Sequence, residues 1–156
     1  MLFRSLTAAA TQPAAAAKTV AVDQVDGFLA IDARGHVTVY SGKVDLGTGV
    51  RTALTQIAAE ELSVPLENIE IVQGDTALTP DQGITWGSLS IQAGGMQLRR
   101  ACATAREALL GKAAEKLGGA ASNLYTKDGQ VMVLGTGKAI SYGQLVGGKH
   151  RSESVV

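Results

Sequence analysis

The sequence predicts an α+β fold in which two β-hairpins and a further strand pack against two main helices. Two pairs of short apolar runs, each pair separated by a glycine-containing turn, indicate the hairpins. Two longer segments, whose apolar residues recur with helical spacing, indicate the helices. Hairpins favour antiparallel pairing over a doubly wound sheet. The order hairpin, helix, strand, helix, hairpin still leaves room for one parallel pair.

The first hairpin is expected to have strands near Gly27–Asp32 and His36–Gly42, with a glycine turn between them. A second glycine turn, Gly47-Thr48-Gly49, precedes a helix in which Thr48 or Gly49 serves as the N-cap, and Pro65 ends that helix. One face of this helix carries the apolar residues Val50, Ala53, Leu54, Ile57, Ala58 and Leu62.

The next elements are a strand over Ile69–Val72, a loop from Ala77 to Ser88, and a long helix over Leu89–Leu117. Each glycine of the Gly94-Gly95 pair costs this helix about 1 kcal/mol relative to alanine, so the pair implies a kink or a close neighbour. The apolar face of the long helix carries Ile91, Gly95, Leu98, Cys102, Ala105, Leu109 and Ala113.

The second hairpin is predicted over Leu124–Lys127 and Gln130–Leu134, joined by an Asp128-Gly129 turn. Ser141–Val146 is expected to form one short helical turn. Residues 1–25 are expected to be an Ala-rich disordered segment, residues 26–148 one domain, and residues 149–156 an unstructured tail.

The composition excludes several classes of protein. Lys and Arg together number 14, as do Asp and Glu, so the formal net charge is zero. A general binder of nucleic acid or of an anionic membrane surface is therefore not expected. No apolar run approaches the ~18 residues of a membrane span. The single cysteine, Cys102, excludes a disulfide within the chain and any Cys-only iron–sulfur or zinc site. Its place on an apolar helix face favours a buried, unreactive thiol.

Glycine accounts for 19 of 156 residues, and two glycine-containing helix starts are the candidate binding features. At Gly47-Thr48-Gly49, N–H groups that face outward would bind an anion, while the alternative is a turn without a ligand. The segment Gly87-Ser88-Leu89-Ser90 offers similar groups at the start of the long helix, with ordinary serine capping as the alternative. If both bind one pyrophosphate-bearing ligand, they must face a common groove.

Other polar residues have simpler interpretations. Trp86, between glycines and before a helix, either walls a pocket or packs on the core as a lid. Asp75 and Asp81 are expected to be turn residues. The pairs Glu60-Glu61 and Arg99-Arg100 are expected on solvated helix faces.

Two long segments resemble a known family. Residues 28–62, which include Tyr40-Ser41-Gly42-Lys43-Val44-Asp45-Leu46-Gly47-Thr48-Gly49, and residues 74–92, which include Thr85-Trp86-Gly87-Ser88, resemble the molybdopterin-binding subunit of the xanthine dehydrogenase/aldehyde oxidase family. The branch is the isoquinoline 1-oxidoreductase β-subunit or nicotinate dehydrogenase large-subunit type. The resemblance covers about residues 27–148 and identifies the fold as part of a larger molybdopterin-binding domain.

The resemblance implies a molybdenum hydroxylase that oxidises an aldehyde or an N-heteroaromatic C–H with water-derived oxygen. Its cofactor would be molybdopterin with molybdenum, in the cytosine dinucleotide form. Gly47-Thr48-Gly49 matches a Gly-Gln-Gly turn of the family, and Thr48 departs from it because a hydroxyl replaces an amide. Gly87, Ser88, Leu89 and Ser90 match a cofactor-binding segment, and Trp86 would stand on the substrate side.

The late Gly-Glu motif that carries the family's catalytic base has no match, because Glu153 lies in Ser-Glu-Ser. The chain is therefore expected to be an N-terminal fragment without catalytic or metal-ligating residues of its own, inactive alone. Apolar surface should be exposed on the Ile91–Leu109 face, at the hairpin edges, or on both. Expected partners are a small-molecule substrate, the remainder of the subunit, an iron–sulfur small subunit and, as a further candidate, a cytochrome c.

By the same resemblance the protein would be periplasmic, with the cytoplasm as the alternative. A different functional class remains open: a stand-alone, non-catalytic binding module that uses the glycine-rich helix starts for a phosphate-bearing ligand. A nucleotide-dependent reductase is a third alternative, for which the Gly47–Gly49 turn is only a degenerate fingerprint.

Overall fold

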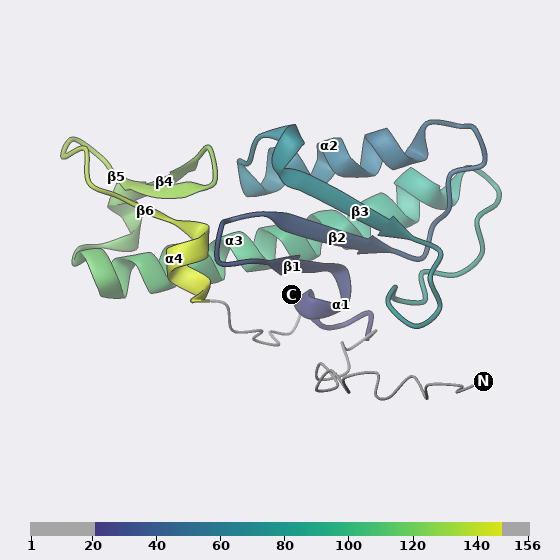
Figure 1. The fold of residues 1–156 in the computed structure, drawn as a ribbon, viewed down its shortest axis with the longest axis horizontal. Helices are drawn as coiled ribbons and strands as arrows, with labels where there is room; N and C mark the ends of the chain where they lie inside the picture. The colour runs from purple at the N-terminus through teal and green to yellow at the C-terminus, as the bar shows by residue number, and fades with distance from the viewer. Residues whose placement is uncertain (1–20, 148–156) are drawn as a thin grey trace, which may run out of the picture.

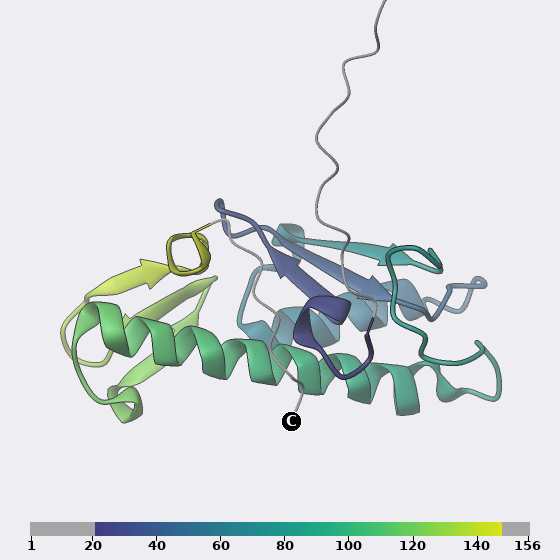
Figure 2. The ribbon, with the colours of Figure 1, turned by 90° about the horizontal axis from the view of Figure 1, so that it is seen from below.

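A computed structural model describes residues 21–147, which form two three-stranded sheets alongside one long helix (Figure 1). The helix α3 (Met96–Leu117) runs beneath both sheets, as Figure 2 shows. The predicted α+β class is confirmed. Most of the N-terminal segment 1–25 and all of the tail 149–156 lie outside the described residues.

The first sheet has the order β1-β2-β3. Strands β1 (Leu29–Ile31) and β2 (Val37–Ser41) pair antiparallel, which confirms the first hairpin with shorter strands. Strand β3 (Ile69–Gln73) pairs parallel with β2, and α2 (Val50–Leu62) connects them. Because parallel strands end at one edge of the sheet, the loops that follow β2 and β3 leave from the same side.

The first predicted strand, which was expected to begin at Gly27, was wrong at its N-terminal end. Gly27 and Phe28 belong to a short helix, α1 (Val25–Phe28), which precedes β1. Phe28 is fully buried, and a Cβ at Gly27 would overlap the backbone carbonyl of Ala21. Tertiary packing around these residues overrides the alternating apolar pattern that suggested an extended strand.

The long helix is confirmed, but it opens with a π-helical turn, η2 (Ser90–Gly95). Both glycines in this turn have close neighbours. A Cβ on Gly94 would lie 2.8 Å from Cγ of Lys43, and a Cβ on Gly95 would lie 3.1 Å from Cδ1 of Ile57. Of the two alternatives that the sequence offered, the close neighbours are confirmed, and the helix geometry changes to a π-helical turn at this point.

The second sheet has the order β4-β5-β6. Strands β4 (Leu124–Lys127) and β5 (Gln130–Val133) form the predicted hairpin around Asp128-Gly129. Strand β6 (Ala139–Ser141), which the sequence did not suggest, pairs with β5. Short 3₁₀ turns precede β3 (η1, Leu66–Asn68) and β4 (η3, Ala121–Asn123). The predicted last turn is α4 (Tyr142–Val146), capped by Ser141 and Gln144 in a capping box.

The core lies between the helices and the sheets. Four of the six predicted apolar residues of α2 are buried, and the α3 residues Leu98, Cys102, Ala105, Leu109 and Ala113 are buried as predicted. Burial raises the pKa of the Cys102 thiol well above its ordinary value, so this cysteine is unreactive, as expected.

Glu61 corrects the expectation of a solvated helix face. Its carboxylate is largely buried, with 14% of the side chain exposed, and it lies 3.1 Å from both the Arg99 and the Arg106 guanidinium groups. Glu61 thereby joins α2 to α3 by a shared ion pair. Neighbouring Glu60 and Arg100 are exposed, as the charge pattern predicts.

Exposed apolar side chains gather where the two glycine-containing segments lie, and only partly where the sequence suggested. On the predicted Ile91–Leu109 face, Ile91 is exposed while the later residues are covered. The exposed large apolar residues near the pocket described below are Leu46, Ile84, Trp86, Leu89, Ile91 and Met96.

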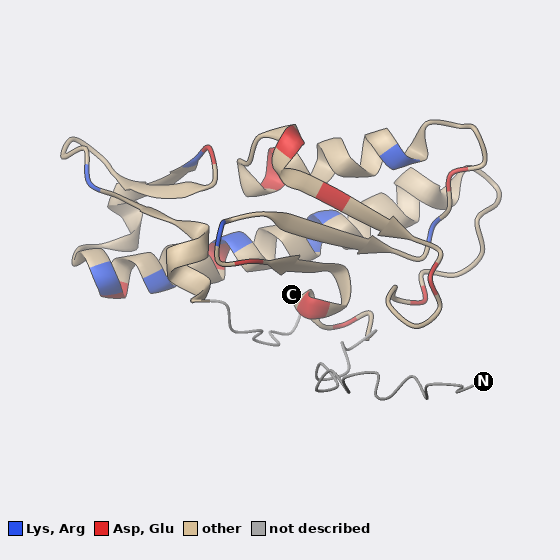
Figure 3. Ribbon diagram, in the orientation of Figure 1, with Lys and Arg blue, Asp and Glu red and all other residues tan. Residues whose placement is uncertain are grey.

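Acidic and basic residues are interspersed along the chain, as Figure 3 shows for residues 21–147. In this described part, none of the helices combines the length and the hydropathy that crossing a bilayer requires.

The hydroxyl of buried Tyr142 donates a 2.6 Å hydrogen bond to the carbonyl of Leu62, which joins α4 to the end of α2. We expect Tyr142→Phe to lower the free energy of unfolding by about 1–2 kcal/mol, because the carbonyl loses a buried donor. Urea unfolding measures this. The control Tyr125→Phe, at a residue 41% exposed, should change it by less than about 0.5 kcal/mol.

The same residue predicts a pH effect. Burial raises the pKa of Tyr142 to about 12 from its ordinary 10.0. The unfolded chain therefore ionises first, and the stability that Tyr142 contributes is lost as pH rises from about 10 to about 12. Unfolding curves across this range should show the wild-type chain losing stability relative to Tyr142→Phe. An unchanged difference would contradict the assignment.

Candidate functional site

The two predicted helix starts meet at one pocket of about 410 Å³. Thr48 and Gly49 of the first segment and Gly87, Ser88 and Ser90 of the second line it. Both segments therefore line one groove, as expected, but the N–H groups of Gly47, Thr48 and Gly49 are hydrogen-bonded to Asp45 rather than facing the groove. Gly47 and Leu89 do not line it. The remaining lining residues are Leu46, Val50, Ala53, Thr85, Trp86 and Ile91.

Trp86 lines this pocket with 64% of its surface exposed. The alternative of a lid packed on the core is therefore wrong for this residue. The pocket lining contains no charged side chain, so its polar character comes from hydroxyl and amide groups.

The start of α2 differs from the sequence expectation of outward-facing N–H groups. The carboxylate of Asp45 accepts hydrogen bonds of 2.9 to 3.2 Å from the N–H groups of Gly47, Thr48 and Gly49, and one of 3.0 Å from that of Arg51. Gly49, the N-cap residue, has a φ of 76°, which glycine adopts without strain. An acid of the chain itself therefore takes the place of an external anion at this helix start.

The charge of Asp45 is stabilised by these contacts. The hydrogen bond from the Arg51 N–H, followed by those from the glycine turn, holds the pKa of the Asp45 carboxyl below its ordinary 3.8. The carboxylate is thus ionised at neutral pH and supplies negative charge beside the pocket.

The second helix start, Gly87–Ser90, has hydrogen-bond donors that no other group of the described chain engages. Within residues 21–147, no hydrogen bond engages the N–H groups of Gly87 and Ser88, or the hydroxyls of Thr48, Ser88 and Ser90. Gly87 and Ser88 have φ values of 59° and 60°, so Ser88 is held in a conformation that non-glycine residues seldom adopt. This donor set suits an oxygen-rich ligand.

Two buried polar side chains that the sequence reasoning missed hold the loop of the second helix start. The Lys43 ammonium donates to the carbonyls of Gly83 (3.2 Å) and Ile84 (2.8 Å). The Gln82 Oε1 atom accepts from the Ser41 hydroxyl (2.8 Å) and the Gly42 N–H (3.0 Å). One signal was present: Val37, Val39, Ser41 and Lys43 continue a single period-two alternation, which points Lys43 inward.

The two aspartates near this loop are turn residues, as predicted. Asp75 accepts from the N–H groups of Ala77 (2.8 Å) and Leu78 (3.2 Å), and Asp81 accepts from that of Gly83 (2.9 Å). Both carboxylates are thus used locally.

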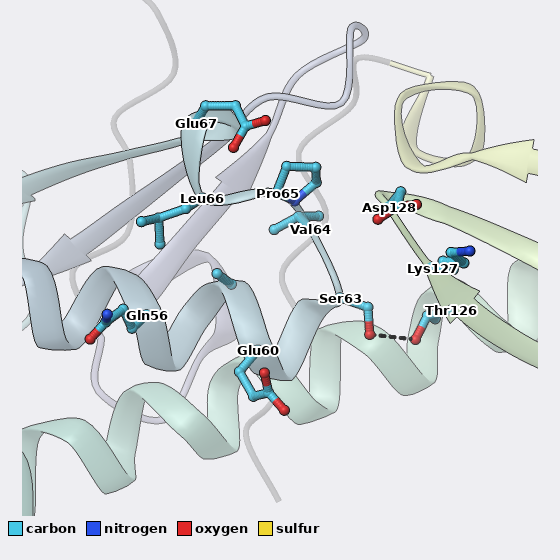
Figure 4. Close-up of a pocket in the computed structure, with 11 residues that line it drawn as sticks. Gln56, Glu60, Ser63, Val64, Pro65, Leu66, Glu67, Thr126, Lys127 and Asp128 are labelled. Atoms are coloured by element: carbon cyan, nitrogen blue, oxygen red, sulfur yellow. Dashed lines mark hydrogen bonds between the residues drawn. The ribbon is translucent and has the colours of Figure 1, made fainter.

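A larger cavity, of about 870 Å³, lies between the end of α2 and the β4–β5 turn (Figure 4). A 2.9 Å hydrogen bond between the Ser63 and Thr126 hydroxyls crosses one end of it. The carboxylates of Glu60 and Glu67 lie on opposite sides of it rather than together. In the described part of the chain, no three His, Cys, Asp or Glu side chains are grouped so that they could hold a metal ion.

Comparison with known proteins places the chain in a family. The sequence profile described as the molybdopterin cofactor-binding domain matches residues 6–155. The chain belongs to the molybdopterin cofactor-binding domain family. The resemblance seen in the sequence is therefore confirmed at the level of the family.

Two curated relatives are similar over most of the chain. It is 43% identical over 123 residues to a subunit of nicotinate dehydrogenase from Pseudomonas putida. It is 37% identical over 115 residues to the gamma subunit of the 6-hydroxypseudooxynicotine dehydrogenase complex from Paenarthrobacter nicotinovorans. These matches cover 79% and 74% of the chain, but only 10% and 14% of the relatives' lengths. Both relatives are named as subunits.

Two solved structures are similar to this chain in fold and sequence. Quinoline 2-oxidoreductase from Pseudomonas putida 86 matches with a TM-score of 0.66 at 31% identity, over 76% of the chain and 15% of the solved one. The Cu,Mo-CO dehydrogenase matches with a TM-score of 0.67 at 27% identity, over the same shares.

Asp45→Ala should release the N–H groups at the start of α2. We expect faster hydrogen–deuterium exchange in a peptide covering residues 46–51, because four amides lose their common acceptor. Since the pKa of Asp45 is lowered in the folded chain, the wild type should lose the same protection, measured against the intrinsic exchange rate at each pH, only as the pH falls through that lowered pKa.

Asp45→Asn is the matched control, because its amide oxygen still accepts and exchange should rise less. Equal exchange in Asp45→Ala and in the wild type would contradict the assigned capping role.

Proposed function

We propose that this chain supplies a molybdopterin-binding surface to a molybdenum hydroxylase. The observation that carries the proposal is the meeting of the Thr48-Gly49 and Gly87–Ser90 segments at one pocket with unengaged donors, in a member of the molybdopterin cofactor-binding domain family.

The residues present fit part of such a cofactor. A pocket of about 410 Å³ accommodates one ring system rather than a whole dinucleotide. The hydroxyls of Thr48, Ser88 and Ser90 and the N–H groups of Gly87 and Ser88 would hold its polar edge, and Gly49 contributes to the lining. At the start of α2, Asp45 engages the N–H groups of Gly47, Thr48, Gly49 and Arg51, so few N–H groups are left there for a phosphate.

Gly47 and Leu89, which the resemblance also implicates, would act indirectly. Gly47 donates to Asp45 and so helps to shape the turn that presents Thr48. Leu89, whose N–H donates to the Trp86 carbonyl (3.1 Å), fixes the bend between the tryptophan and the π-helical turn.

When bound, molybdopterin with molybdenum would supply the two-electron oxidation of a substrate C–H. The part of this chain would be to bind and orient. Exposed Trp86 would provide a flat wall beside which a planar aromatic substrate stacks. The named activities of the relatives, on nicotinate and quinoline, support an N-heteroaromatic substrate, and the similarity to human aldehyde oxidase keeps aldehydes as the alternative.

The chain would not act alone. It spans 10% to 15% of the lengths of the two curated relatives and the quinoline 2-oxidoreductase chain described above, and both curated relatives are named as subunits. The remainder of the subunit would supply the catalytic base. An iron–sulfur small subunit would accept the electrons, with a cytochrome c as a further partner. The cytosine dinucleotide form and a periplasmic location are proposed from the family resemblance only.

The alternative of a stand-alone phosphate-binding module is weakened by Asp45. That alternative depends on free N–H groups at a glycine-rich helix start, and the carboxylate already engages them at α2.

The first test measures cofactor content. In the complete complex that contains this chain, we expect the double change Ser88→Ala and Ser90→Ala to lower molybdenum and pterin content roughly tenfold, because two hydrogen bonds to the cofactor are lost. Metal analysis and pterin fluorescence measure this. Ser122→Ala, in the exposed turn before β4, is the control and should leave the content unchanged. Equal content in the double variant and the control would refute the proposed surface.

The second test concerns substrate choice. In the complete complex, Trp86→Ala should change the ratio of kcat/KM between a heteroaromatic and an aldehyde substrate more than it changes cofactor content. Trp86→Phe, which keeps an aromatic face, should change the ratio less. The isolated 156-residue chain should turn over neither substrate. Turnover by the isolated chain would overturn this division of labour.

A further inference from the structure

We infer that Lys43 is a positioning residue of the pocket: its buried ammonium group holds the loop that carries Trp86 and Ser88 in the shape a ligand would meet. This inference rests on the proposed function, and it assigns a role to a side chain that does not line the pocket itself.

Lys43 is an unusual lysine because only 2% of its surface is exposed. Among residues 21–147 it has no carboxylate within ion-pair distance, and its contacts are the carbonyls of Gly83 and Ile84. Burial of a cation is costly unless hydrogen bonds compensate for the lost water. Here both compensating bonds go to one short stretch of backbone, so the charge is tied to the position of that stretch.

The loop has little main-chain support of its own. For residues 80–87, the only hydrogen bond between main-chain groups runs from the Leu89 N–H to the Trp86 carbonyl. Its other attachments use side chains. Gln82 bonds to the Ser41 hydroxyl and the Gly42 N–H, Lys43 bonds to the carbonyls of Gly83 and Ile84, and the Thr85 hydroxyl accepts from the Val44 N–H (3.1 Å). The last two attachments come from Lys43 and Val44, consecutive residues just after β2, and they lead directly into Trp86.

The stem of Lys43 is fixed from the other side. It packs against Gly94 in the π-helical turn, where an added Cβ would lie 2.8 Å from the lysine Cγ. Gln82 continues this support, since its Nε2 donates to the carbonyl of Gly94 and to Oε1 of Gln97, both at 3.0 Å. The lysine therefore connects three parts of the pocket wall: the end of β2, the loop, and the turn before α3.

Trp86 is the only tryptophan in the chain, so its fluorescence reports on this loop alone. In the 156-residue chain, Lys43→Met keeps the stem but removes the ammonium. We expect a lower steady-state anisotropy of Trp86 and stronger quenching by acrylamide. Lys43→Arg, which keeps the charge and the donors, should recover most of the wild-type values. The exposed Lys138 gives the matched control, Lys138→Met, which should leave both signals unchanged.

A purely structural role would lower the melting temperature without a selective change at Trp86, so far-UV circular dichroism melts are recorded on the same samples. If Lys43→Met does not fold, the same fluorescence measurements are made on Gly94→Ala, because its added Cβ displaces the lysine stem while the ammonium remains. Unchanged Trp86 anisotropy in Lys43→Met would overturn the inference. If that variant does not fold, unchanged anisotropy in Gly94→Ala would do the same.

A second measurement tests whether the position of the loop affects cofactor binding. In the complete complex, Lys43→Met should lower cofactor content roughly fivefold, and Lys138→Met should not. Altered Trp86 signals with unchanged content would overturn the positioning role. If the serine double variant also left content unchanged, the proposed function would fail instead, while the fluorescence arm would still report whether Lys43 holds the loop.

Discussion

Two buried polar side chains, Lys43 and Gln82, determine where the pocket loop lies. They leave from the end of β2 and from the loop itself, and their hydrogen bonds join the loop to the first sheet and to the turn before α3. Because β2 and β3 are parallel, both loops start at one edge of the sheet, and these bonds then hold them together. The pocket, the exposed tryptophan and the unengaged serine donors all depend on this attachment.

The chemical character of the pocket follows from Asp45. A glycine turn before a helix ordinarily attracts anions, but here a carboxylate three residues before Thr48 satisfies the first N–H groups. Among residues 21–147, the unengaged pocket donors are the Thr48 hydroxyl and the Val50 N–H of the first segment, and the N–H groups of Gly87 and Ser88 and the hydroxyls of Ser88 and Ser90 of the second. The two glycine-containing segments therefore differ: the first uses most of its turn N–H groups on Asp45 and presents Thr48, and the second leaves more donors available to a ligand.

The sequence predicted most of the fold because its signals were local. Apolar periodicity defined α2 and α3, the Asp128-Gly129 turn defined the second hairpin, and the expected helix starts do meet in space. Strand β6 was missed because Ala139–Ser141 has three residues, too few to show a strand alternation. Lys43 and Gln82 were missed because their partners lie about 40 positions away and only the fold brings them together. Asp45 was missed although its partners are local, because it reaches forward onto the turn and the helix that follow it. The period-two alternation indicated that Lys43 points inward, but it did not reveal which carbonyls its ammonium would meet.

The pocket between Thr48 and Ser88 is proposed to receive the cofactor, and the decisive measurement is an experimental structure of the complete, cofactor-loaded complex. We expect cofactor atoms within hydrogen-bond distance of the Ser88 or Ser90 hydroxyls, with Lys43 still bonded to the Gly83 and Ile84 carbonyls. Another protein segment filling this pocket, with the cofactor in contact with none of these residues, would refute the proposed surface.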